Sequence, residues 1–452
     1  MTYKLVIENA RLITLDPQRP DCFAGWLAVD EHGRVADLGE GKAPSDAFET
    51  VDVEEAFVAP GFVSGHSHLS TSGSRGLGQD SALYAWADHM TRYTRHCDAE
   101  DIYWAVLHGA LDFLSNGITT AYDFTDSRLP FFMEEGRKMV HGAFKPSAYN
   151  TEQIRAKVDA GMRFIHSIMI NDQVGTDEEI EARFGESLAY ADGLERQDLH
   201  LGHAISGSVQ WSDEPATAVR EVSIMRRFKV INQPHFLETS ENLEFQRSKF
   251  TWYEEAGALG PDLVFGHFIH PTEDMKCKCA AHNCAMIWQP TSNGRLASGF
   301  ADIPGIIEKG MRVGVGLDDQ ACTDVSDPWQ NMRMGIYMQR AARQDPKAMG
   351  VAQMLRLHTM GSAEALGIAD RVGSLEVGKF ADFVVVDPRS PDLGPVWDPI
   401  GTYVLAVSLR NLKAVYVGGA CVNREGVSTN PLAAQASVEL HGRLGRIARD
   451  LA

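Results

Sequence analysis

The sequence of 452 residues lacks the segments that place a protein in a membrane or outside the cell. No apolar run is long enough to cross a bilayer. The N-terminal stretch "MTYKLVIENARLITLDP" has no uninterrupted apolar core of the kind found in a signal peptide. The seven cysteines are an odd number and show no framework spacing. We therefore expect reduced thiols and a cytoplasmic protein.

An excess of positive charge is also missing. The formal net charge is -19 and is spread along the chain rather than gathered in blocks. This distribution argues against nucleic acid or an anionic membrane surface as a partner, and it is explained best by solubility. The expected partner is a small-molecule substrate. The length predicts one large domain plus something smaller.

Several catalytic and metal signatures are absent as well. The sequence has no HExxH, no His-x-Glu paired with PCxxC, and no GxGxxG after an apolar strand. The segment "CKCAAHNC" at 277–284 is rich in cysteine, but its pattern predicts a helix that runs into a strand rather than paired zinc knuckles.

The sequence does contain short apolar runs that alternate with helical segments. The runs are mostly apolar, as strands buried on both faces must be. The predicted strands are 60–66, 117–124, 162–170, 199–205, 229–236, 263–268, 284–289 and 311–317. Eight strand–helix repeats predict an α/β fold, a (β/α)8 TIM barrel, over residues 58–368.

The two ends of the chain have a different pattern. Residues 1–57 and 369–430 show strand alternation with turn signals, which predicts one small β-sandwich domain built from both chain termini. Residues 431–452 predict an amphipathic helix. Its apolar face leads us to expect a homo-oligomer, although the same face could pack on the barrel.

Potential metal ligands stand where predicted strands end. The carboxyl ends of parallel barrel strands share one mouth, and His66 and His68 point the same way because side chains alternate along a strand. With His235 and Asp318 they supply three imidazoles and a carboxylate. This set suits one divalent ion, Zn²⁺ first, with Fe²⁺, Co²⁺ or Mn²⁺ as alternatives. Glu238, three residues after His235, occupies the place of a proton carrier, unless it is a solvated loop residue.

Taken together, six motifs resemble the amidohydrolase superfamily. They are "PGFVSGHSH", "HFLET", "FGHFIH", "QPTSNGRLASG", "VGLDD" and "GSLEVGKFADFVVVD", and they cover nearly the whole chain in order. The most similar group is that of the cytosine-deaminase-like and triazine-hydrolase-like enzymes, which includes S-adenosylhomocysteine deaminases. The resemblance implies that His66, His68, His235 and Asp318 hold the metal and that Glu238 shuttles a proton.

The resemblance also implies roles for further residues. His267 would steady the attacking water or the substrate, His203 would touch the substrate, and Ser292 and Asn293 match the family's "SN". Barrels of this kind with two metals typically bridge them by a modified lysine at the end of strand four. His203 stands there in this sequence, so one metal per chain is expected.

The sequence departs from the family at the last metal ligand. Leu317 stands where threonine is usual, and a second acid, Asp319, follows Asp318. The segment "LDDQACTDVSDPWQNM" is slightly similar to that of cytosine deaminase. These changes touch the predicted substrate pocket and leave the metal set intact.

The expected function is that of a metal-dependent hydrolase that uses activated water to deaminate a purine, pyrimidine, pterin or triazine and releases ammonia. Arg75 and Trp86, in the loop 69–90, could hold a flat ring, although Trp86 equally suits an apolar prop. Hydrolysis of a urea, carbamate or amide C–N bond, or loss of another ring substituent, is the alternative reaction. A noncatalytic metal-binding protein of the same fold is a further alternative.

Overall fold

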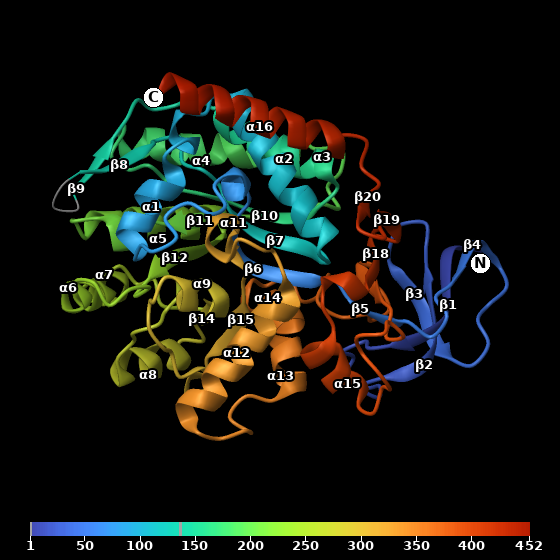
Figure 1. The fold of residues 1–452 in the computed structure, drawn as a ribbon. Helices are drawn as coiled ribbons and strands as arrows, with labels where there is room; N and C mark the ends of the chain where they lie inside the picture. The colour runs from blue at the N-terminus through green and yellow to red at the C-terminus, as the bar shows by residue number, and fades with distance from the viewer. Residues whose placement is uncertain (1, 135–137) are drawn as a thin grey trace.

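A sheet of parallel strands forms the centre of the computed structural model, which describes residues 2–134 and 138–452 (Figure 1). Every pair of neighbouring strands in this sheet is parallel. Each of the eight predicted strands is present with ends shifted by a few residues. They are β6 (Phe62–His68), β7 (Ile118–Phe124), β10 (Arg163–Ile168), β11 (His200–Gly207), β12 (Ile231–Phe236), β13 (Val264–His267), β14 (Ala285–Trp288) and β15 (Arg312–Val315).

The first and last strands of this sheet are linked through a two-residue strand. β16 (Asp318–Asp319) follows β15 almost directly and pairs in parallel with β6. In this pairing Asp318 lies opposite Ser67 and Asp319 lies opposite His68. The eight strands with their helices therefore form a TIM-barrel-like α/β fold, and the linkage sets Asp318 beside the two histidines of β6.

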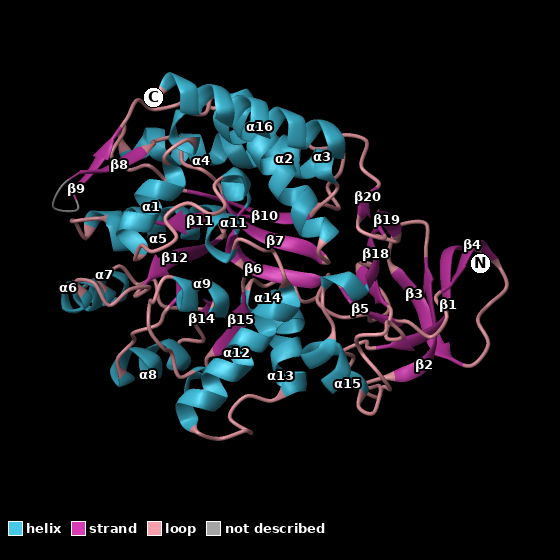
Figure 2. Ribbon diagram, in the orientation of Figure 1, coloured by secondary structure: helices cyan, strands magenta, loops and turns pink. Residues whose placement is uncertain are grey.

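Helices surround this sheet (Figure 2). Their first turns carry capping residues that the sequence supplies locally: Asp98 accepts from the backbone N–H of Asp101, and Thr176 forms a capping box with Glu179. The helices are α1 (Leu83–Thr91), α2 (Ala99–Ser115), α3 (Ala148–Ala160), α4 (Asp177–Asp192), α5 (Ala216–Phe228), α6 (Leu243–Ser248), α7 (Phe250–Glu255), α8 (Glu273–Ala281), α9 (Pro290–Arg295), α10 (Ile303–Glu308), α11 (Gln320–Thr323), α12 (Pro328–Arg343), α13 (Val351–Arg356), α14 (Ser362–Ala365), α15 (Pro399–Gly401) and α16 (Ala433–Asp450). As predicted, the cysteine-rich segment is a helix, α8, that leads into a strand, β14.

Strands from both ends of the chain join one nine-stranded sheet beside the barrel (Figure 1). β17 pairs antiparallel with β5 and so connects the C-terminal strands with the N-terminal ones. The members are β1 (Tyr3–Leu12), β2 (Phe23–Val29), β3 (Val35–Glu40), β4 (Ala47–Asp52), β5 (Phe57–Pro60), β17 (Phe383–Val386), β18 (Leu412–Val417), β19 (Ala420–Arg424) and β20 (Val427–Ser428). β5 thus extends this sheet beyond the boundary predicted at residue 57. A separate two-stranded sheet is made by β8 (Phe131–Glu134) and β9 (Lys138–His141).

The C-terminal helix α16 lies along α2 (Figure 1). Leu440 and Ile447 on its apolar face are buried, and Arg443 and Arg446 form ion pairs with Asp101 of α2. The apolar face is therefore covered within the chain, and it does not by itself support self-association. Among the described residues, the helices are too short or too polar to cross a lipid bilayer.

Candidate active site

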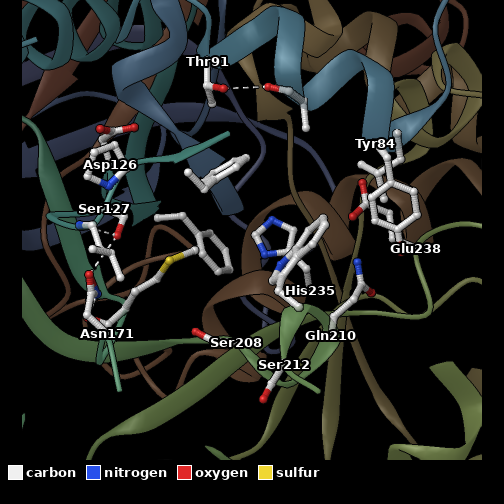
Figure 3. Close-up of a pocket in the computed structure, with 18 of the residues that line it drawn as sticks. Tyr84, Thr91, Asp126, Ser127, Asn171, Ser208, Gln210, Ser212, His235 and Glu238 are labelled. Carbon is white, nitrogen blue, oxygen red and sulfur yellow. Dashed lines mark hydrogen bonds between the residues drawn. The ribbon is translucent and has the colours of Figure 1, made fainter. Parts of the chain in front are cut away.

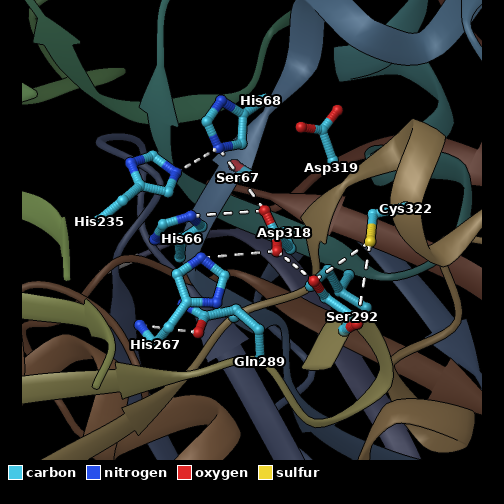
Figure 4. Close-up of polar contacts among 12 residues, drawn as sticks. His66, Ser67, His68, His235, His267, Gln289, Ser292, Asp318, Asp319 and Cys322 are labelled. Atoms are coloured by element: carbon cyan, nitrogen blue, oxygen red, sulfur yellow. Dashed lines mark hydrogen bonds and ion pairs between the residues drawn. The ribbon is translucent and has the colours of Figure 1, made fainter. Parts of the chain in front are cut away.

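The four predicted metal ligands converge at the carboxyl ends of their strands (Figure 4). The Nε2 atoms of His66 and His68 lie 3.4 Å and 3.6 Å from Oδ1 of Asp318. The Nε2 atoms of His68 and His235 are 3.1 Å apart. Nitrogen and carboxylate atoms of these residues and of His267 form overlapping groups of three, each within 4.8 Å. Residues from four separate strands thus aim their donor atoms at one point.

The backbone turns sharply where two of these strands end. His267 has φ 66° and Asp318 has φ 69°, which is the left-handed region that residues other than glycine rarely adopt. Gly316, between β15 and β16, allows the chain to pass close to β6, because a Cβ at this position would lie 2.7 Å from the backbone nitrogen of His66. The strained turns and the close approach direct the side chains of His267 and Asp318 into the mouth of the barrel.

The hydrogen bonds of His66 leave one nitrogen for a metal ion. The Gln233 amide donates to the carbonyl oxygen of Gly65 at 3.0 Å, which turns its Oε1 toward Nδ1 of His66 at 2.6 Å. Nδ1 of His66 therefore carries the proton, and the lone pair of Nε2 faces the cluster. This buried Nε2 has no hydrogen-bond partner among the described residues. A divalent cation would satisfy it, so the donor set fits the metal that the sequence implies.

Burial keeps the imidazoles neutral and the ligand carboxylate ionised. Burial and the neighbouring His66 lower the pKa of His68 to about 3, and burial lowers the pKa of His267 to about 3. Burial would raise the pKa of Asp318, but the histidines around it, His267 first, hold that pKa well below its usual value. Neutral imidazoles beside an ionised carboxylate are the protonation states that a metal ion requires.

A second carboxyl group lies at the edge of the cluster, where Glu238 forms a group with His267 and Asp318 whose ligand atoms lie within 4.8 Å of one another. Glu238 is buried, and its Oε1 lies 3.5 Å from Nε2 of His267. Burial, followed by the charges of Asp318 and Asp319, raises the pKa of Glu238 well above its usual value. Glu238 therefore holds a proton more tightly than an exposed glutamate does, as a proton donor to a substrate needs to.

Ser292 and Asn293 support the metal cluster. Ser292 donates from Oγ to Oδ2 of Asp318 at 2.5 Å, and Asn293 donates from Nδ2 to Nδ1 of His267 at 2.9 Å. Neither residue lines the cavity. In this structure they orient the side chains of Asp318 and His267, and the prediction that they contact the substrate stays a prediction.

A cavity of about 590 Å³ opens above the cluster (Figure 3). His68, His235, Glu238 and Asp318 reach it, and Trp86 from α1 forms part of its wall. Its further apolar lining comes from Leu83, Met90, Phe124, Leu129, Met169 and Trp211. A cavity of this size accommodates a ring compound of the predicted class.

The structure does not bring His203 or Arg75 to this cavity. His203 lies within β11 rather than at its end, and its Nε2 lies 2.9 Å from Oγ of Ser187 in α4. Arg75 donates instead to Oδ2 of Asp112 in α2 at 2.5 Å. Both were predicted to bind substrate, and in this structure each side chain turns toward the surrounding helices instead of the cavity.

Other residues line the cavity that the sequence did not single out. Ser208 and Gln210 follow β11, and Phe124 ends β7 with its ring stacked on His68 at a centroid distance of 4.9 Å. Asp319, which the sequence already placed near the predicted pocket, is also buried in this wall. The stretch "GSVQW" after strand four carried a signal, because polar residues directly after a barrel strand lie at the mouth.

Comparison with known proteins identifies the family. The model of the Amidohydrolase family matches residues 57–422. Because this match spans most of the chain, the protein belongs to the Amidohydrolase family.

Two similar relatives are curated deaminases. The chain is 29% identical over 433 residues to a 5-methylthioadenosine/S-adenosylhomocysteine deaminase of Syntrophobacter fumaroxidans, covering 92% of each chain. It is 26% identical to a 5'-deoxyadenosine deaminase of Methanosarcina acetivorans, covering 92% of this chain and 91% of the relative.

Solved structures share the fold at lower identity. An adenosine deaminase from Xanthomonas campestris with bound zinc has a TM-score of 0.84 at 21% identity, covering 99% of both chains. An atrazine chlorohydrolase from Arthrobacter aurescens in complex with zinc has a TM-score of 0.84 at 20% identity, covering 97% of this chain and 100% of the other. At this level of identity the likeness establishes the fold.

Proposed function

We propose that this protein is a metal-dependent aminohydrolase that deaminates an aminated nitrogen heterocycle of purine, pyrimidine, pterin or triazine type and releases ammonia. The observation that carries the proposal is the convergence of three imidazoles and Asp318 at a cavity whose wall holds a separate, buried Glu238. The curated deaminases with which the chain aligns over nearly its whole length support it.

In this proposal His66, His68, His235 and Asp318 hold one divalent ion, Zn²⁺ first, with Fe²⁺, Co²⁺ or Mn²⁺ as alternatives. The ion, when bound, supplies a Lewis acid and lowers the pKa of water from about 15.7 to about 7. The zinc in the two solved structures of the same fold agrees with this assignment.

Side chains of the protein transfer the protons and orient the reacting groups. Glu238 protonates the ring nitrogen next to the carbon that loses its amino group. Nε2 of His267, which lies 3.5 Å from Glu238 and 3.8 Å from Oδ2 of Asp318, orients the attacking oxygen. Asp318 accepts the proton that the attacking water gives up, and that proton reaches the departing amine, which could not leave as an anion. Trp86 bounds the substrate ring.

The test is a turnover screen followed by one substitution. Aminated purines, pyrimidines, pterins and triazines, with ureas and carbamates included, are assayed for ammonia, amine and carbon dioxide. On the best substrate, Glu238→Gln should lower kcat about 100- to 10,000-fold while bound metal stays near wild type. The matched control is Glu178→Gln at an exposed position of α4, which should leave kcat unchanged.

Two results would contradict the proposal. Amine or carbon dioxide in place of ammonia would favour hydrolysis of a urea, carbamate or amide bond. Nearly full turnover by Glu238→Gln with its metal bound would remove the proton carrier, and a leaving group that needs no protonation would then explain the site better.

Other features stay proposals. We propose that the terminal sheet folds over itself as a sandwich, which the shared core of Leu5, Leu27 and Phe383 supports, and that the chain divides at residues 57, 368 and 430. We also propose that the protein is cytoplasmic and forms a homo-oligomer. We propose further that it binds neither nucleic acid nor membranes, which the net charge of -19 supports. Light scattering that finds only monomer at micromolar concentration would contradict self-association.

A further inference from the structure

The side chain of Gln210 is an unpaired amide in the wall of the cavity. Gln210 lies in the short helix η3 (Val209–Trp211) directly after β11 and is 2% exposed. No hydrogen bond of ordinary geometry joins Nε2 or Oε1 of its side chain to the described residues, and the amide interacts only loosely with the carboxyl of Glu238. Burial of an amide without partners is unfavourable. Gln210 is therefore explained best as a group that pairs with a ligand.

The backbone around Gln210 is held in place. Its carbonyl oxygen accepts from Nζ of Lys249 at 2.7 Å and from Nε2 of Gln246 at 3.3 Å. Both donors come from the segment that contains α6. Because the main chain is fixed from this side, the amide is presented to the cavity as a preformed pair of donor and acceptor.

Gln210 also lies next to the proposed proton carrier. Gln210 and Glu238 line the same part of the cavity (Figure 3). The amide is near enough to Glu238 to oppose part of the rise in the pKa of that carboxyl. When a ring nitrogen of the substrate accepts the proton of Glu238, the ring atoms next to that nitrogen therefore face the amide of Gln210.

We propose that Gln210 selects substrates that carry an oxo or amino group on the ring carbon flanking the nitrogen that Glu238 protonates. This inference rests on the proposed deamination. In a six-membered heterocycle, the atom that follows the protonated nitrogen is a carbon. An oxo group there accepts from Nε2 of Gln210, and an amino group donates to Oε1. The substrate class is thus an aminated ring with a cyclic urea or guanidine edge.

An unsubstituted adenine ring fits this wall less well. The carbon between its two ring nitrogens bears only hydrogen. The ring would therefore cover the amide of Gln210 and displace its water without forming a hydrogen bond in return. A site built to form a hydrogen bond rejects an analogue that lacks the partner group much more strongly than an apolar site rejects a missing methylene.

The experiment compares matched substrates that differ only at this carbon. The pairs are isoguanine with adenine, 2-aminoadenosine with adenosine, and cytosine with 4-aminopyrimidine, each assayed for ammonia with the metal-loaded wild-type enzyme. The expected result is a kcat/KM at least about tenfold higher for the substituted member of whichever pair is turned over, since one hydrogen bond contributes about that factor. Equal or better turnover of the unsubstituted member would overturn the inference.

A substitution then assigns the preference to the amide. Gln210→Met keeps the length of the side chain and removes the amide, and it should erase the preference by lowering kcat/KM of the substituted member more than that of the unsubstituted member. The matched control is Gln339→Met, a buried glutamine in α12 that bonds Ala301 and does not line the cavity. This control should keep the preference.

The remaining outcomes are also decisive. If Gln210→Met lowers turnover of both members equally and shifts the pH profile, the amide acts on Glu238 alone, and the inference is wrong. If Gln210→Met fails to fold, the preference of the wild type decides. Deamination without any preference overturns the inference and leaves the proposed function standing, whereas no deamination of any ring overturns both.

Discussion

Replacement of Lys157 by methionine should destabilise the protein strongly. Nζ of Lys157, in α3, donates to Oδ2 of Asp123 at 2.5 Å and to Nδ1 of His166 at 2.9 Å. The side chains of Lys157 and Asp123 are 0% and 1% exposed. Lys157→Met would leave the Asp123 carboxylate buried without its counter-charge. Removal of one partner of a buried pair costs about 3–5 kcal/mol in the free energy of unfolding.

The same substitution should weaken metal binding. The other oxygen of Asp123, Oδ1, accepts from the backbone N–H of Leu69 at 3.0 Å. Leu69 directly follows His68, so Asp123 fixes the chain at a proposed ligand. Without Lys157, Asp123 avoids an uncompensated charge by taking up a proton or turning away. Either change weakens the hydrogen bond between Asp123 and the backbone of Leu69, and so allows His68 to move away from the metal.

Urea unfolding of the metal-loaded protein, followed by tryptophan fluorescence, measures the first effect, and competition with a chelator measures the second. Lys413→Met is the matched control. Nζ of Lys413 is 3.1 Å from Oε2 of Glu425, but the two side chains are 38% and 63% exposed, so the loss should stay under about 1 kcal/mol.

A second variant separates charge from packing. Asp123→Asn combined with Lys157→Met removes both charges and should recover most of the lost stability. The reasoning is refuted if the single variant lies within about 1 kcal/mol of wild type. It is refuted equally if the double variant is no more stable than the single one.

Two further predictions concern the metal and the pH dependence of stability. Metal analysis should give about one equivalent per chain, with metal and activity lost together in His235→Ala; two bridged ions would contradict the ligand set. Burial raises the pKa of Glu221 to about 7, so the stability that Glu221 contributes is present below its unfolded pKa and is lost as the pH rises through about 7. Wild type should therefore lose up to about 1.4 kcal/mol per pH unit relative to Glu221→Gln between pH 5 and 7 in urea unfolding, and parallel profiles would contradict this.

The barrel and the convergence of the candidate metal ligands could be predicted from the sequence because two strong physical patterns coincide. Strands buried on both faces must be apolar along their length, so runs such as 62–68 and 118–124 stand out. Parallel strands also share one mouth, so polar residues at their carboxyl ends come together whatever their separation in the chain. His68 and His235 are far apart in sequence, yet their Nε2 atoms are 3.1 Å apart.

The same burial explains why the sequence placed His203 nearer the mouth than the structure does. An exposed strand reveals its faces by alternating polar and apolar residues, but a strand covered on both sides does not. The predicted strand 199–205 ended two residues before β11 does, which placed His203 too close to the mouth. Within β11, His203 shares a face with Ile205, and both pack toward the helices, where Phe184 lies against each of them. Arg75 was misplaced for a different reason, since nothing near it in sequence indicates its partner Asp112.

The adjacent acids Asp318 and Asp319 show how one residue of offset divides two roles. Successive side chains of a strand point to opposite sides, and β16 aligns Asp318 with Ser67 and Asp319 with His68. Asp318 thereby enters the group of histidines that keeps it ionised. Asp319 meets no such group, and burial together with the charge of Asp318 raises its pKa well above the usual value. The first acid is therefore suited to a cation, and the second to a wall that meets a neutral ring.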